Sequence, residues 1–239
     1  MDIPQTVRTA LADQPVCGST CLEAGAGVGN TTAGLLAEGC ARVYAVTNDG
    51  EHATTVRERV GREESDRTAV LEADLRDVPL SDDSIELITA HGLFNVLAPD
   101  ALGTVVAELT RVAKPGCRLV VDDYAPLPDD AAVSDLFAVE NAITELAEGR
   151  PALTFYPVSV LRRLFAGYGW EFDRKRILLD PVPWTASHVE AHTEVVRRAA
   201  ETLSSDVGES LLEEAERLAA EIGEESVGEM YSVAMRLPR

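Results

Sequence analysis

The feature that most constrains the fold is a regular alternation of short apolar runs with segments of helical periodicity. Runs rich in β-branched residues predict strands, and apolar stripes at helical spacing predict helices. The predicted strands are residues 19–24, 42–47, 68–73, 84–90 and 117–123, and the helices between them are 29–38, 50–60 and 100–112. This alternation is typical of a doubly wound α/β sheet.

The second half of the chain continues with longer helices and two more segments of strand character. Helices are predicted at 130–148, 157–168, 187–203 and 207–222, and strands at 171–179 and 230–237. No internal repeat or low-complexity linker divides the chain, so we expect one domain over residues 1–239. The prediction is a mostly parallel, seven-stranded sheet with helical insertions.

A glycine-rich segment follows the first predicted strand and reads Glu23-Ala-Gly25-Ala-Gly27-Val-Gly29. Glycines at alternate positions let the backbone turn tightly and let a ligand approach it closely. The helix that opens at Gly29 or Asn30 would present free backbone N–H groups to a polar ligand. The segment therefore predicts a ligand-binding loop.

The spacing of these glycines excludes two common nucleotide sites. A dinucleotide loop has the pattern G-x-G-x-x-G, but Asn30 or Thr32 stands where the third glycine belongs, depending on the frame. A phosphate-binding P-loop requires Gly-Lys-Ser/Thr, which does not occur in the sequence. An NAD-dependent oxidoreductase is therefore disfavoured.

Polar residues follow the other predicted strands where each one ends. Asn48 and Asp49 follow the second strand, Asp74 the third, and His91 with Gly92 the fourth. Ligands of open α/β sheets bind outside the carboxyl ends of the strands. We therefore expect these residues and the glycine-rich loop to share one site.

Four segments, in this order, resemble the motifs of class I S-adenosylmethionine-dependent methyltransferases. Residues 21–29 resemble the first motif with Glu23 in its acidic position, and 71–75, 78–88 and 111–120 resemble three later ones. The resemblance implies a Rossmann-like fold and S-adenosylmethionine as the cofactor. It also implies that two groups of residues contact the cofactor. The residues of the glycine-rich loop are Glu23, Gly25, Ala26, Gly27 and Gly29, and the residues that face the adenine are Asp74 and Leu75.

The sequence departs from the family at the end of the second strand. Family members usually carry an acid there that holds both ribose hydroxyls, but the position in register is Thr47. Asn48 or Asp49 is the candidate replacement. Asp49 is preferred because a carboxylate accepts hydrogen bonds from two hydroxyl groups better than an amide does. An interpretation of Asp49 as only a helix cap stays open.

Methyl transfer from a sulfonium mainly requires alignment, and a base is needed only when the acceptor must lose a proton. His91 is the candidate base, and it is also a candidate cofactor contact that merely lines the pocket or caps the next helix. Asp122, Asp123 and Tyr124 end the fifth strand and either face the acceptor or form a solvated turn. The Asn/Asp-Pro-Pro-Tyr/Phe signature of many amino-methyltransferases is absent. No metal site is predicted.

Acceptor specificity in this family usually resides in segments added to the core. With the core at about residues 15–125, the additions are 126–156 and 185–226, which we interpret as a lid or an oligomer surface. The second addition separates two strands that usually form a close hairpin. Trp184, Phe155 and Tyr156 either line an apolar acceptor pocket or belong to the core.

The charge is unusual, with 41 acidic against 21 basic residues and a net charge of −20. The acids are spread along the whole chain, a pattern that resembles proteins of extreme halophiles. No basic stripe favours nucleic acid as a partner.

The four cysteines show no metal-ligand spacing, and neither a membrane-spanning run nor a signal peptide is visible. We expect a cytoplasmic protein without a membrane partner, and an oligomer stays open.

These observations predict an enzyme that transfers a methyl group to a small-molecule acceptor. Its motif style is closest to methyltransferases of quinone biosynthesis. Two alternatives remain: a methyltransferase that acts on RNA or protein, and a non-catalytic subunit that binds S-adenosylmethionine.

Overall fold

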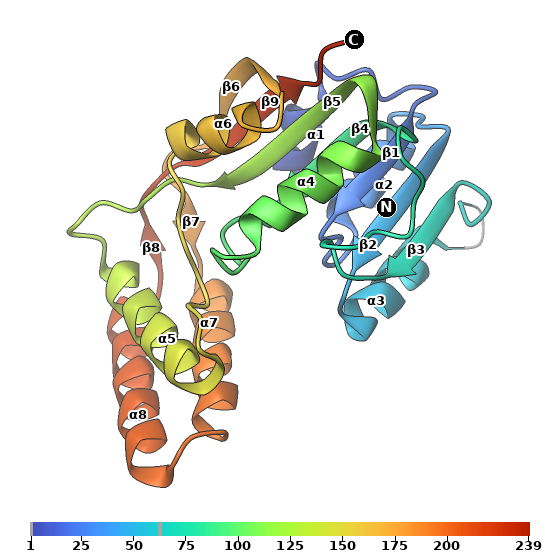
Figure 1. The fold of residues 1–239 in the computed structure, drawn as a ribbon. Helices are drawn as coiled ribbons and strands as arrows, with labels where there is room; N and C mark the ends of the chain where they lie inside the picture. Colours follow the sequence, from blue (N-terminus) through green and yellow to red (C-terminus); the bar gives the residue numbers. More distant parts are fainter. Residues whose placement is uncertain (1, 62–63) are drawn as a thin grey trace.

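The computed structural model describes residues 2–61 and 64–239 of the chain, which are built around a seven-stranded sheet (Figure 1). The strand order is β3-β2-β1-β4-β5-β9-β6, in which the first five strands are parallel and β9 is antiparallel to both of its neighbours. The strands are β1 (Thr20–Ala24), β2 (Arg42–Thr47), β3 (Thr68–Glu72), β4 (Ile85–His91), β5 (Ala113–Tyr124), β6 (Glu171–Leu179) and β9 (Met230–Arg236). The predicted mostly parallel, doubly wound sheet is confirmed.

Both faces of the sheet are buried under helices, as expected for parallel strands. Neighbouring residues of β1 face opposite sides of the sheet. Cys21 packs in the apolar cluster on one face and Leu22 in the apolar cluster on the other, and a different set of helices covers each face. The first set is α1 (Gln5–Leu11), α2 (Asn30–Ala37) and α3 (Gly50–Val60), and the second is α4 (Leu102–Val112) and α6 (Val158–Ala166). Apart from α1, the predicted boundaries agree with these helices to within a few residues.

The start of β5 differs from the prediction. The predicted strand covers residues 117–123, but β5 already begins at Ala113, which pairs with Ile85 of β4. Gly116 adopts a positive φ of 87°, and its N–H donates to the Leu237 carbonyl at 2.9 Å. The start of β5 is therefore irregular, since the register of its pairing with β4 shifts between Ile85 and Leu87.

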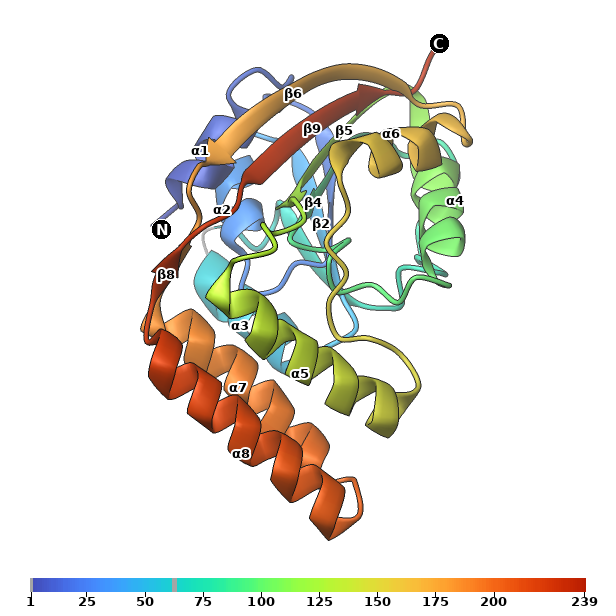
Figure 2. The ribbon, with the colours of Figure 1, turned by 90° about the vertical axis from the view of Figure 1, so that its left-hand side faces the viewer.

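Three helices project away from the sheet as a separate lobe, which we call the helical arm (Figures 1 and 2). They are α5 (Ala132–Glu148), α7 (Ala186–Ala200) and α8 (Ser205–Ile222). Their apolar stripes pack on one another in a common cluster. A short ribbon, β7 (Pro183–Trp184) with β8 (Glu225–Ser226), leads from the sheet into the arm. The sequence analysis missed this ribbon because each strand has only two residues.

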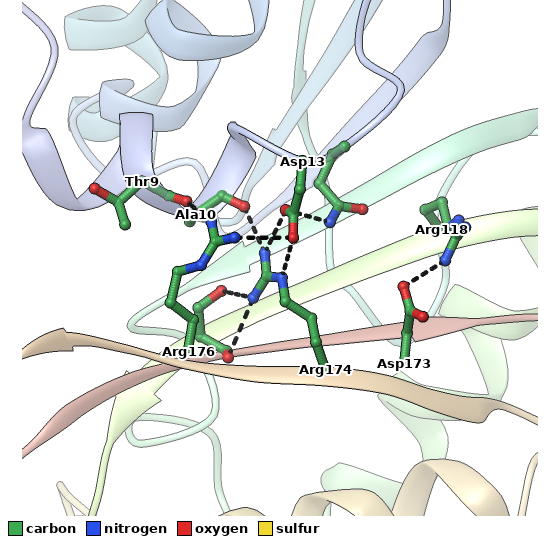
Figure 3. A network of polar contacts seen from close by, with 9 residues as sticks. Thr9, Ala10, Asp13, Arg118, Asp173, Arg174 and Arg176 are labelled. Atoms are coloured by element: carbon green, nitrogen blue, oxygen red, sulfur yellow. Dashed lines mark hydrogen bonds and ion pairs between the residues drawn. The ribbon is translucent and has the colours of Figure 1, made fainter.

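The sequence analysis also missed helix α1, which is anchored to the edge strand β6 by arginines (Figure 3). Arg174 donates to the Ala10 carbonyl at 2.7 Å and forms two hydrogen bonds to the Asp13 carboxylate. Arg176 donates to the Thr9 carbonyl. Partial burial raises the pKa of Asp13, but these hydrogen bonds and charges outweigh it and hold the pKa at about 2. Side chains from distant segments thus fix a helix too short to persist alone.

Within the described part of the chain, no helix is both long enough and apolar enough to cross a membrane.

Candidate functional site

The glycine-rich loop joins β1 to α2 at the carboxyl end of the sheet. Gly25 and Gly27 both adopt positive φ angles, of 73° and 49°. A Cβ added to Gly25 would lie 2.8 Å from Cδ1 of Leu93, whereas a Cβ on Gly27 would meet open space. The N–H groups of Gly25 and Ala26 donate to the Val46 carbonyl at 3.0 and 2.8 Å, which fixes the start of the turn against β2. The backbone at Gly27 is therefore open to a ligand.

A cavity of about 730 Å³ lies beside this loop, within the size range of small-molecule sites. Of the residues predicted to bind a cofactor, it brings together Gly25, Asn48, Asp74 and Leu75. The other predicted residues do not line it; these are Glu23, Ala26, Gly27, Gly29, Asp49 and His91. Thr47, which stands in place of the family acid, is also in the wall.

Part of the cavity wall comes from segments that the sequence analysis did not assign to the site. The loop after β4 contributes an apolar stretch that includes Leu93 and Val96, and residues 148–151 at the end of α5 contribute Arg150. Leu93 could have been predicted, because it follows the carboxyl end of β4 and ligands of open α/β sheets bind beyond such strand ends. No local signal marked residues 148–151, since only the tertiary fold brings them to the cavity.

Asp49 caps helix α3. Its side chain accepts hydrogen bonds from the backbone N–H groups of Glu51 at 2.8 Å and His52 at 3.0 Å. These bonds depress the pKa of this exposed carboxyl, with the bond from His52 contributing most. The capping interpretation is confirmed, and contact between Asp49 and a cofactor ribose stays a prediction.

Glu23 lies beneath the loop and is only 2% exposed. The hydroxyl of Thr32, in the first turn of α2, donates to its Oε2. Burial raises the pKa of Glu23 to about 7, against the opposing effects of Thr32 and of the nearby His91. The acid of the first motif thus ties the end of β1 to the helix that follows the loop.

His91 ends β4 and pairs in register with Asp122 of β5. Its Nδ1 lies 3.1 Å from Oδ2 of Asp122, while Oδ1 of Asp122 is buried without a hydrogen-bond partner. Burial alone would lower the pKa of His91, but the hydrogen bond to Asp122 and the charges of Asp122, Glu23 and Asp123 raise it. The imidazole therefore sits among three carboxyl groups.

Asp122 and Asp123 are 4% and 1% exposed, so the solvated-turn interpretation of these residues is wrong. They are buried because β5 extends through Tyr124 between β4 and β9. Asp123 accepts from the backbone N–H of Asn95 at 3.2 Å, and Asn95 Oδ1 accepts from the N–H of Tyr124 at 3.1 Å. Burial raises the pKa of Asp123 to about 7. Asn95, which the sequence analysis missed, joins the loop after β4 to the end of β5.

The three aromatic residues considered for the acceptor pocket do not share one environment. Trp184 and Phe155 lie in an apolar cluster at the base of the helical arm, where Phe137 contacts both rings with centroids 5.1 and 5.6 Å away. The Tyr124 ring is 5.3 Å from that of Trp184, so this cluster touches the end of β5. Tyr156 packs instead against the core between the sheet and α4.

Among the described residues, no group of His, Cys, Asp or Glu side chains is arranged to hold a metal ion, and the four cysteines are free thiols.

Part of the chain resembles known proteins in sequence. Residues 22–121 match the family model described as a methyltransferase domain. The chain is 36% identical over 123 residues to demethylmenaquinone methyltransferase of Clavibacter sepedonicus, covering 51% of this chain and 48% of that protein. It spans about half the length of the curated relatives it matches.

Solved structures share the architecture over nearly the whole chain. A candidate methyltransferase from Bacillus halodurans has a TM-score of 0.68 at 15% identity, covering 98% of this chain and 99% of that one. Geranyl diphosphate C-methyltransferase from Streptomyces coelicolor, solved with S-adenosyl-L-homocysteine, has a TM-score of 0.62 at 16% identity, covering 97% and 76%. At these identities the likeness shows the fold.

The fold is that of Rossmann-like methyltransferases, and residues 22–121 match the methyltransferase domain model. More particularly, this matched segment contains nearly all of the four motifs that resemble the class I S-adenosylmethionine-dependent methyltransferase family. The cofactor of that family is S-adenosylmethionine, in agreement with the sequence prediction.

Proposed function

We propose that the chain catalyses methyl transfer from S-adenosylmethionine to a small-molecule acceptor. One observation carries the proposal: the cavity wall contains Gly25 and Leu93, which follow Glu23 and His91 by two residues each, and His91 contacts the buried Asp122. A cofactor site thereby adjoins groups able to move a proton.

The residues around the cavity suit the parts of S-adenosylmethionine. In the cavity wall, Asn48 would hold the ribose and Asp74 with Leu75 would face the adenine. Outside the wall, the open backbone at Gly27 would admit the methionine portion, and Asp49 is the second candidate for the ribose. When bound, the cofactor supplies a methyl group on a positively charged sulfur, ready for displacement. The chain's own task is to align the acceptor, exclude water and accept any proton that is released, and His91 is the candidate base.

A small-molecule acceptor is favoured over a macromolecule by charge and by resemblance. The sequence shows no basic stripe that would follow the phosphate backbone of RNA. The relative from Clavibacter sepedonicus is named for a small-molecule acceptor, demethylmenaquinone. The helical arm at the edge of the site is the candidate lid over such an acceptor.

The acidic composition supports a cytoplasm rich in salt as the working environment. At molar salt the Debye length is only about 3 Å, so the repulsion among the 41 acidic side chains would be screened. The four free thiols suit a reducing compartment. Unfolding and cofactor binding measured from dilute to concentrated KCl test this part, and stability that falls with added salt would contradict it.

Calorimetry with S-adenosylmethionine and with NADH, both in concentrated KCl, tests the cofactor. We expect binding of the first ligand alone. Gly25→Ala should weaken that binding by at least about tenfold, since a Cβ there strains the backbone and collides with Leu93. Gly18→Ala is the matched control, because Gly18 has a similar φ of 75° at the other end of β1 but open space around it.

Transfer of a radiolabelled methyl group into a cell extract, sorted into small molecules, RNA and protein, tests the reaction. Label in the small-molecule fraction is the expected result. Label in RNA or protein would refute the small-molecule acceptor, and cofactor binding without any transfer would favour the non-catalytic subunit.

A further inference from the structure

Three adjacent central strands bring four titratable side chains to the carboxyl end of the sheet, with Glu23, His91 and Asp122 on one face and Asp123 on the other. Glu23 comes from β1, His91 from β4, and Asp122 and Asp123 from β5. The three carboxyl groups are 2%, 4% and 1% exposed. The His91 side chain retains 24% exposure, so it is the member of the cluster that a ligand can reach. Burial of this kind is costly and calls for a functional reason.

The contact between His91 and Asp122 fixes which ring nitrogen holds the proton. An ionised carboxylate is only an acceptor, so at 3.1 Å from Oδ2 the Nδ1 atom must carry hydrogen. In the neutral ring, Nε2 then holds the lone pair. The ladder pairing of His91 with Asp122 keeps the two side chains in register, and the fold thus selects one tautomer.

We propose that Asp122 is a positioning residue that holds His91 as a general base through Nε2, and that the acceptor is a group that loses a proton. This inference rests on the proposed function. Its acceptor class is a hydroxyl or an acidic C–H group. Tertiary amines and thioethers, which are methylated without loss of a proton, are not acceptors of this site.

The proton and charge balance explains the carboxyl groups. His91 Nε2 takes the proton from the acceptor atom, and the electron pair freed there forms the bond to the methyl carbon. The carbon–sulfur pair stays on sulfur, which becomes neutral, and the positive charge reappears on the imidazolium of His91. Asp122, which contacts the ring, and the charges of the more distant Glu23 and Asp123 stabilise it as it forms.

The unpartnered Oδ1 of Asp122 supports a polar ligand at the same place. Buried carboxylate oxygens almost always accept a hydrogen bond, and this one has no protein donor among the described residues. A hydroxyl or amide group of the acceptor would satisfy it. Asp122 would then hold both the base and the molecule that the base acts on.

Nitrogen-15 NMR of the histidine rings tests the positioning role without cofactor or acceptor. The chain has four histidines, so the His91 signals are assigned by comparison with His91→Gln. We expect neutral His91 to carry its proton on Nδ1, and Asp122→Asn to change this tautomer and lower the pKa of the ring. A neutral His91 with its proton on Nε2 in the unaltered protein would overturn the proposal.

Kinetics with the acceptor found by methyl labelling test the chemistry. Asp122→Asn should lower kcat at least about a hundredfold, raise KM by a smaller factor because one acceptor oxygen is lost, and move the rise in rate with pH to lower pH. Asp173→Asn, at an exposed ion pair with Arg118, is the matched control and should keep full turnover. An unchanged rate and pH profile in Asp122→Asn would overturn the role of Asp122.

The labelled product separates this inference from the proposed function. A methyl group on oxygen, or on a carbon that carried hydrogen, supports a proton-bearing acceptor. A sulfonium or quaternary ammonium product would refute the acceptor class while confirming methyl transfer. Failure of the chain to bind S-adenosylmethionine would refute the proposed function itself, and the NMR result on His91 would stand independently.

Discussion

Replacing Glu23 by Gln should stabilise the protein at alkaline pH, although Glu23 belongs to the first motif. The side chain is 2% exposed, and burial raises its pKa from 4.5 to about 7. The folded state holds this proton more tightly than the unfolded state does. The free-energy cost of burying the ionised carboxylate is therefore absent below the pKa that Glu23 has in the unfolded chain. It grows as the pH rises and is complete above about pH 7.

The size of the effect follows from that pKa change. Each pKa unit corresponds to about 1.4 kcal/mol, so the buried carboxylate costs about 3 kcal/mol above neutral pH. Glutamine still accepts the Thr32 hydroxyl, but its buried amide N–H group offsets about 1 kcal/mol of the gain. We therefore expect Glu23→Gln to raise the free energy of unfolding by about 2 kcal/mol near pH 8 and by almost nothing near pH 5.

Urea unfolding followed by tryptophan fluorescence, at constant high salt and several pH values, measures this difference. Glu86→Gln is a control of opposite sign, because the hydrogen bond from the Thr20 N–H and the charge of Lys114 lower the pKa of Glu86. A Glu23→Gln variant that loses the same stability at both pH values would refute the reasoning. It would mean that the Thr32 contact outweighs the cost of burial.

Three further outcomes are expected. Asp49→Ala should lower the Tm by uncapping α3, while Asp49→Ser keeps the cap, so weaker S-adenosylmethionine binding by the serine variant in calorimetry would reveal a ribose contact. Asp13→Asn should cost about 1 kcal/mol at neutral pH, discounted because the side chain is 37% exposed, and thermal unfolding should show the loss vanish as the pH falls towards 2. Gly34→Ala should lower the Tm despite the better helix propensity of alanine, because its Cβ would lie 2.6 Å from Cγ1 of Val7, and Val7→Ala should restore much of it.

The sheet could be predicted because its strands carry their own signals. Segments 42–47 and 171–179 match β2 and β6 residue for residue, since apolar and β-branched runs bounded by turn residues are local features. Helix α1 and the β7–β8 ribbon carry no such signal. Their stability comes from partners far along the chain, such as Arg174 for α1. No window of sequence contains that information.

The site was predictable to the extent that it follows from strand ends. Gly25, Asn48 and Asp74 meet at one cavity because the carboxyl ends of parallel strands share an edge. His91 and Asp122 were each considered, but not as a pair. Their contact depends on the register between β4 and β5, and the irregularity near the start of β5 shifts that register. A register shift of one residue would move Asp122 to the opposite face of the sheet.

The acceptor is hard to infer from the sequence for a structural reason. The apolar stripes of α5, α7 and α8 are used in packing the arm on itself, so they do not describe the acceptor. The arm meets the sheet at its base, where Tyr124 of β5 contacts Trp184 and Trp184 donates from Nε1 to the Val227 carbonyl at 3.1 Å. The arm is therefore joined to the sheet through this apolar base, and its residues 148–151 line the cavity. Acceptor choice should therefore depend on this base and on residues 148–151 more than on the helices themselves.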